Sequence, residues 1–172
     1  MASAGAGSVV AANAFEQAGL AYVITSANTV TVTGGASGNS ATEITIPDAV
    51  RSNGTTYSVT TIGFYDFGSA GITSVTIGNS VTTIDDEAFY DNRLTSLTIP
   101  DSVTDLGATA FSYNTLTSVS LLGNFESYDL SMFTGNSNLT TITFVQGKTG
   151  WPKTFTTAGS GSDTTTSQPA TP

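Results

Sequence analysis

The chain has 172 residues, of which 38% are apolar and 10% are charged, and it contains no cysteine and no histidine. Disulfides and thiol chemistry are therefore excluded, and the side chain most often used as general base and metal ligand is missing. The formal net charge of −9 opposes attraction to nucleic acid or anionic lipid, so we expect no nucleic-acid partner.

Residues 1–14 are small and apolar but lack a basic residue and a sustained apolar run, which makes them a poor signal peptide. We expect them to be a disordered leader or the start of an expressed mature chain. No stretch approaches the roughly 18 consecutive apolar residues of a membrane-spanning helix, so no membrane span is expected.

The first predicted strands fall in residues 15–41. Residues 20–25 and 29–33 are rich in strand-forming residues and flank a turn at Ser26-Ala27-Asn28, which predicts a β-hairpin. Because an open stack of repeats needs its terminal apolar face shielded, we interpret residues 15–41 as an N-terminal hairpin cap.

A repeated pattern follows the hairpin. We place its units near 42–71, 72–93, 94–115 and 116–138, with a partial unit at 139–147. The first unit is widened by an insertion, in which Asn53-Gly54 is a strong signal for a two-residue hairpin turn.

Six apolar positions recur in register from unit to unit, which predicts that equivalent side chains meet their counterparts in a shared core. These columns are Ile72, Leu94, Leu116 and Leu139; Val75, Leu97, Val119 and Ile142; Ile77, Ile99, Leu121 and Phe144; Val81, Val103 and Phe125; Ile84, Leu106 and Tyr128; and Phe89, Phe111 and Phe133.

Each unit is expected to contain a strand, a second extended piece and a helical turn. The alternation at Val75 and Ile77 is typical of a strand with one buried face, and Glu87-Ala88-Phe89 is interpreted as the helical turn. One unit buries too little to fold alone, whereas stacked units cover each other. We therefore predict a β-rich α/β fold, a solenoid with a parallel β-sheet.

An asparagine stands three residues after the phenylalanine of each unit, at Asn92, Asn114 and Asn136. A buried amide at this position can bond to the backbone of the adjacent turn. We predict a structural ladder of asparagines along the stack.

The segment from Leu94 to Gly107, followed by Ala110-Phe111, resembles the unit of the BspA-like leucine-rich repeats of microbial surface proteins, whose pattern is L-x-x-I-x-I-P-x-S-V-T-x-I-G-x-x-A-F. The position of the asparagines is often cysteine in that family. The resemblance covers about residues 15–147. It implies a leucine-rich-repeat solenoid that is secreted or displayed at the cell surface and takes part in adhesion.

The repeat pattern weakens toward the C-terminus. Residues 121–125 replace the expected turn of the third unit, which predicts an altered turn there. We interpret 148–152 as a C-terminal closure that ends the repeat region near residue 157, with Trp151 plugging the end of the core. Residues 158–172 are mostly Gly, Ser, Thr and Pro and read as a flexible tail.

The acidic run Asp85-Asp86-Glu87, with Asp91 nearby, is the best candidate for acid–base or calcium chemistry. The run is not repeated in the next unit, which has Gly107, Ala108 and Thr109 instead. A solvated acidic turn explains it more simply. We expect no catalytic residues, no metal site and no cofactor, and hence no enzyme.

The most informative surface is the outward face of the repeated strand, because serine and threonine alternate there with the buried columns. Glu43 and Thr45 open this row. The candidate ligand-binding residues are Ser74, Thr76, Ser96, Thr98, Ser118, Ser120, Thr141 and Thr143.

Three interpretations of this array remain open. It can be an adhesion surface that offers many weak hydrogen bonds to an extracellular protein or glycan. It can be the neutral surface of a structural spacer, or, less favourably, an ice-binding array. Tyr90 and Tyr113 are further candidates for binding anchors, although packing between turns explains them equally well.

Overall fold

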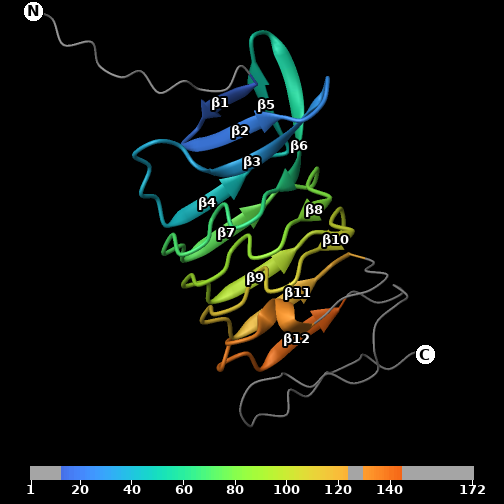
Figure 1. Ribbon diagram of the computed structural model, residues 1–172. Coiled ribbons are helices and arrows are strands. Elements are labelled where there is room, and N and C mark those ends of the chain that lie inside the picture. Colours follow the sequence, from blue (N-terminus) through green and yellow to red (C-terminus); the bar gives the residue numbers. More distant parts are fainter. Residues whose placement is uncertain (1–12, 124–129, 145–172) are drawn as a thin grey trace, which may run out of the picture.

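The computed structural model describes residues 13–123 and 130–144, and nearly all of its regular structure is β-strand (Figure 1). Its described part contains one short helix, the 3₁₀ helix η1 (Leu130–Phe133). The predicted helical turn at Glu87-Ala88-Phe89 is wrong, because these residues form turns in which Glu87 has a φ of +57°. A left-handed residue ends any right-handed helical run. The expected α component of the fold is therefore almost absent.

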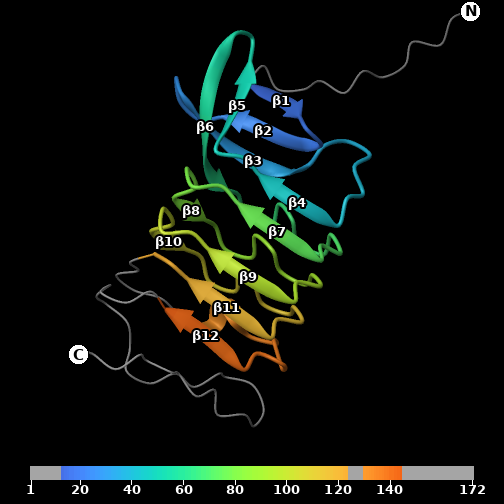
Figure 2. The same cartoon turned by 180° about the vertical axis from the view of Figure 1, so that it is seen from behind.

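Successive units place one strand each along one side of the molecule, where the strands run parallel (Figures 1 and 2). One parallel pair is β4 (Glu43–Ile46) with β7 (Ser74–Ile77). A parallel sheet of three follows, in the order β12 (Thr141–Phe144), β11 (Ser118–Leu121) and β9 (Ser96–Ile99).

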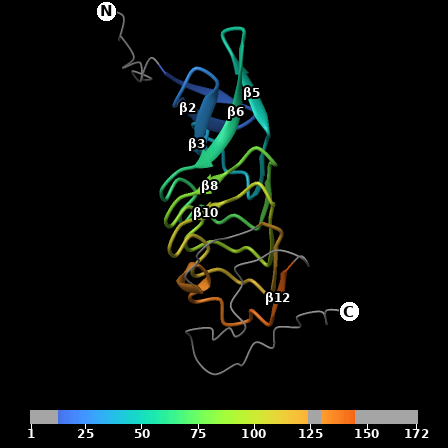
Figure 3. The same cartoon turned by 90° about the vertical axis from the view of Figure 1, so that its right-hand side faces the viewer.

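The predicted second extended piece is a strand in the first three units: β6 (Thr55–Ile62), β8 (Thr83–Ile84) and β10 (Asp105–Leu106). These strands pair in parallel, and β3 (Thr29–Gly35), which precedes the first unit, joins the row by parallel pairing with β6. Seen from the side, the coils of the chain pile up in an elongated column (Figure 3). Each layer therefore meets the next through both sets of strands.

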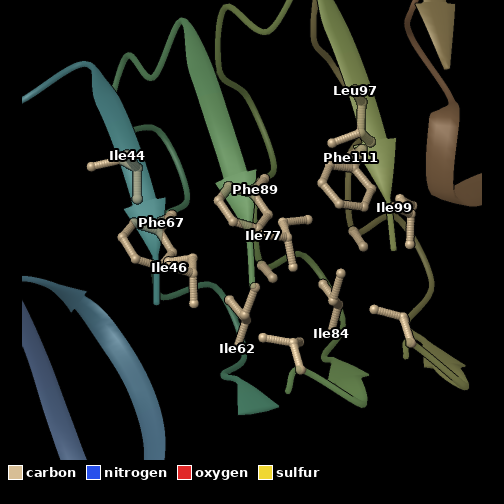
Figure 4. Close-up of a cluster of buried hydrophobic side chains, with 14 of the residues drawn as sticks. Ile44, Ile46, Ile62, Phe67, Ile77, Ile84, Phe89, Leu97, Ile99 and Phe111 are labelled. Atoms are coloured by element: carbon tan, nitrogen blue, oxygen red, sulfur yellow. The ribbon is translucent and has the colours of Figure 1, made fainter. Parts of the chain in front are cut away.

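The core runs between these strands, and its phenylalanines stack on one another (Figure 4). Ring centroids are 5.2 Å apart for Phe67 and Phe89, 5.3 Å for Phe89 and Phe111, and 6.2 Å for Phe111 and Phe133. The predicted columns are confirmed wherever the side chains are described, except that Val75 and Leu106 are only partly buried. Phe125, Tyr128, Trp151 and the predicted tail lie outside the described residues, as does the side chain of Phe144.

The predicted asparagine ladder is present. Each Oδ1 accepts the backbone N–H that begins its own unit, as in the 3.0 Å bond from Leu94 to Asn114. Each Nδ2 donates to a phenylalanine carbonyl 25 residues earlier, as in the 3.0 Å bond from Asn114 to Phe89. Neighbouring units are thus joined by buried polar bonds as well as by apolar contact.

At the N-terminal end the strands are antiparallel. The expected hairpin of residues 20–33 is formed by β2 (Leu20–Ile24) and β3, and it is preceded by β1 (Ala14–Gln17), which the sequence did not predict. The Asn53-Gly54 hairpin is confirmed: it joins β5 (Ala49–Ser52) to β6, with φ of +50° and +84° at the two turn residues.

Candidate functional site

The eight candidate residues lie together on one face, which we call the hydroxyl face: Ser74, Thr76, Ser96, Thr98, Ser118, Ser120, Thr141 and Thr143. Parallel pairing aligns them in two rows, since Ser118 lies opposite Ser96 and Thr141, and Ser120 lies opposite Thr98 and Thr143. Period-2 alternation turns their side chains outward while the intervening residues enter the core. Ser118 and Ser120 are half-buried and the other six are exposed.

Threonines at the start of the strands behave differently from those on the face. The hydroxyls of Thr73, Thr117 and Thr140 donate to a backbone carbonyl of the preceding unit, as from Thr117 to Thr95 at 3.1 Å and from Thr140 to Thr117 at 3.3 Å. Within the described residues, none of the eight hydroxyls of the hydroxyl face makes a hydrogen bond. Their bonding capacity is free for water or a ligand.

The hydroxyl face is uncharged from Ser74 to Thr143, and its first row begins with Glu43, which pairs in register with Ser74. It is also divided. Strands β7 and β9 lie side by side (Figure 1) but belong to separate sheets. The described part has no Thr95-to-Thr73 bond equivalent to the bond from Thr117 to Thr95. The sequence predicted one continuous array, whereas the backbone ladder breaks after the second strand.

The described residues hold no group of three or more acidic side chains placed to bind a metal ion, and none of their helices is long and apolar enough to cross a membrane. In the predicted acidic turn, Asp86 is exposed and its Oδ1 accepts the N–H of Ala108 at 2.7 Å. This bond links the turn to the next unit, which gives Asp86 a structural role.

Sequence reasoning missed Asp66, the most strongly perturbed carboxyl group of the described chain. Burial, followed by the nearby charge of Asp85, raises the pKa of Asp66 to about 6. Alignment of Phe67 with Phe89 and Phe111 would have revealed it, because Asp66 stands where Ala88 and Ala110 are completely buried in the later units.

Comparison with protein families matches residues 37–156 to the BspA type leucine-rich repeat region, with six copies of the repeat. A comparison with curated protein sequences found no match.

Several solved structures have a similar fold. A leucine-rich cell surface protein from Faecalibacterium prausnitzii is 23% identical with a TM-score of 0.57, and the match covers 82% of this chain and 45% of that one. The pneumococcal vaccine antigen PcpA is 18% identical with a TM-score of 0.64, and the match covers 78% of this chain and 38% of that one. A leucine-rich repeat protein from Eubacterium ventriosum is 26% identical with a TM-score of 0.62, and the match covers 76% of this chain and 32% of that one. The chain thus spans less than half the length of each of these structures.

Proposed function

The chain belongs to the family of proteins with BspA-type leucine-rich repeats, and we propose that it is a non-enzymatic module that binds an extracellular protein or glycan. We propose further that it is secreted or displayed at the cell surface and serves in adhesion. The cell surface description of the Faecalibacterium prausnitzii relative supports this location.

The observation that carries the proposal is the set of free hydroxyls on the hydroxyl face. The hydroxyls of Thr73, Thr117 and Thr140, at strand entries, are bonded within the chain, whereas the eight on the face have no protein partner in the described part. Hydroxyls both donate and accept, so a regular array of them can match the polar edges of a glycan or of a peptide backbone. Individually weak bonds gain strength when many are made at once and when many copies are displayed.

We also propose that the repeats form a solenoid whose N-terminal end is capped by residues 15–41. Two observations support the cap. Strand β3 pairs with β6 of the first unit, and Phe15 places its ring 5.4 Å from Tyr22 and 6.3 Å from Tyr57. The apolar end of the stack is thereby covered by strands that do not repeat.

The test is binding of the labelled chain to a panel of extracellular matrix proteins and to a glycan array. The decisive variant carries Thr76→Val, Thr98→Val and Thr143→Val, which removes three hydroxyls and keeps the side-chain shape. Its matched control carries Thr→Ser at the same three positions and keeps the hydroxyls. We expect the valine variant to lose binding and the serine variant to retain it.

Three results would contradict the proposal. Binding by the valine variant at the wild-type level would place the ligand site elsewhere. Absence of saturable binding to every probe would favour the spacer interpretation, and faceted ice crystals in a freezing droplet would favour ice binding.

A further inference from the structure

A second surface lies on the turns that follow β6, β8 and β10, away from the hydroxyl face. It is the aromatic strip, which consists of Phe64, Tyr65, Tyr90 and Tyr113. Ring centroids are 6.3 Å apart for Phe64 and Tyr65, 6.2 Å for Tyr65 and Tyr90, and 5.2 Å for Tyr90 and Tyr113. The strip therefore crosses three successive turns as one chain of contacting rings.

The strip faces solvent. The exposed fractions of Phe64, Tyr65 and Tyr113 are 62%, 41% and 53%, and these are the large apolar side chains that stand out from the described surface. An exposed, contiguous aromatic patch is a common mark of a binding surface, because tyrosine combines a large apolar face with a polar end.

Backbone conformation adds a second reason to assign a function to the strip. Tyr65 and Tyr113 have φ of +56° and +55°, a region that costs a bulky residue more than it costs glycine or asparagine. Position 113 corresponds to Ser69, Asp91 and Gly135 in the other units. A tyrosine ring is thus held outward at a site where small residues satisfy the fold.

The surroundings of the strip are negative. The pKa of the Tyr90 hydroxyl is raised, first by local desolvation and then by Tyr113, Asp91 and Glu87. Asp91 is exposed and Glu87 is half-buried, and within the described residues neither contacts a basic side chain. Arg93 is the only basic residue between positions 52 and 147. The carboxylates beside the rings therefore lack a cation.

We propose that the aromatic strip binds an arginine-containing segment of a partner protein. A guanidinium group can stack on a tyrosine face and at the same time donate to a carboxylate at the edge of the ring. The rings are tilted by 39° and 57° where Tyr90 meets Tyr65 and Tyr113. Such facets suit several separate planar cations better than the flat, extended surface of a glycan. The proposal is independent of the hydroxyl face.

The experiment titrates the full chain with a short glycine- and serine-spaced peptide carrying three arginines, and it follows the ring protons of the tyrosines by NMR. Parallel titrations use the same peptide with three lysines, the same peptide with three glutamates, and a neutral oligosaccharide. Three variants accompany the wild type: Tyr113→Asn, Asp91→Asn and the control Asp101→Asn, which removes the same charge from an exposed turn outside the strip. Asparagine tolerates positive φ, so the first two variants preserve the backbone.

We expect saturable shifts of the strip tyrosines with the arginine peptide and none with the glutamate peptide. Loss of one ring contact or one carboxylate should weaken binding by about threefold, as should replacement of arginine by lysine. Asp101→Asn should bind as the wild type does. Binding of the arginine peptide by Tyr113→Asn with wild-type affinity would overturn the proposal. Equal binding of the arginine and lysine peptides by all variants would overturn it too, because it would indicate only a general attraction of cations to an acidic chain. A response of the strip to the oligosaccharide alone would equally overturn it.

Discussion

Asn114→Ala is expected to be among the most damaging single substitutions in the chain. The Asn114 side chain is buried and accepts the N–H of Leu94 at 3.0 Å. It donates to the carbonyls of Phe89 and Phe111, both at 3.0 Å. Alanine removes all of these bonds and adds no clash, so the effect isolates the missing amide.

The magnitude follows from the groups that lose their partners. The N–H of Leu94 and the carbonyl of Phe89 belong to different units, and the bonds from Asn114 are what joins them across the layer. Leaving a buried polar group unsatisfied costs about 1–3 kcal/mol. Two such groups give an expected loss of about 2–6 kcal/mol in the free energy of unfolding, against total stabilities of about 5–15 kcal/mol for single domains.

Urea unfolding followed by far-UV circular dichroism measures this loss. Asn138→Ala is the matched control, because it removes the same side chain from an exposed position in the repeats. Asn114→Asp adds a test of mechanism. A carboxylate accepts the N–H of Leu94 but cannot donate to Phe89, whereas the protonated acid can. Stability of Asn114→Asp should therefore fall as the pH rises from about 4 to 7. If Asn114→Ala and Asn138→Ala lose equal stability, the ladder does not join the units.

Three further substitutions test other parts of the structure. Asp66→Ala should raise the free energy of unfolding at pH 7 by about 1 kcal/mol, because it removes a half-buried carboxylate that is charged at this pH. The raised pKa alone would give a larger value, but the carboxylate's contact with water reduces the cost of its charge. Since the folded pKa of about 6 lies above the ordinary 3.8, wild-type stability should fall as pH rises from 4 to 6, and the advantage of the variant should vanish near pH 4. Asp101→Ala, in an exposed turn, controls for the change in net charge. An advantage of Asp66→Ala that does not depend on pH would refute this explanation. Gly107→Ala should lower the free energy of unfolding in urea by at least about 2 kcal/mol, because a Cβ there would clash with the backbone of Asp85 and Asp86. Gly35→Ala, whose Cβ would lie 3.7 Å from its nearest neighbour, should have a small effect, and equal effects of the two variants would contradict the packing. Tyr22→Phe should stabilise the chain by up to about 1 kcal/mol, because the buried hydroxyl has no partner, and a measured loss of stability would show that it has one.

The sequence was most informative where identical chemistry recurs in register. The Phe89 and Phe111 column and the Asn92 and Asn114 ladder are predictable because each layer repeats the same packing and bonding problem. An error in one unit would have been exposed by its neighbours. For the same reason the parallel pairing of Ser96 with Ser118 follows from the period alone.

What the sequence did not predict depends on features that differ between units. Strand β1 is short and only partly buried, and it is stabilised by pairing with β2 rather than by its own pattern. Glu87 gave a helix-like signal, but left-handed φ values depend on how the turn closes against the next layer. The break in the backbone ladder between β7 and β9 could not be predicted, because both strands carry the same Ser-x-Thr-Ile pattern. Asp66 was missed because the position before the phenylalanine, which is Ala88 and Ala110 in the later units, was not among the six apolar columns.

The position of a threonine within the repeat, rather than its identity, decides what its hydroxyl does. At a strand entry, as at Thr117, the hydroxyl lies beside a carbonyl of the preceding unit and donates to it. On the strand face, as at Thr98, the side chain points outward, while the backbone carbonyls are engaged in the ladder with the next strand. The fold therefore uses the hydroxyls of Thr73, Thr117 and Thr140 to join its layers and leaves those of the hydroxyl face free. Thr117→Val should accordingly lower stability, whereas Thr98→Val should leave stability unchanged and affect only what the hydroxyl face binds.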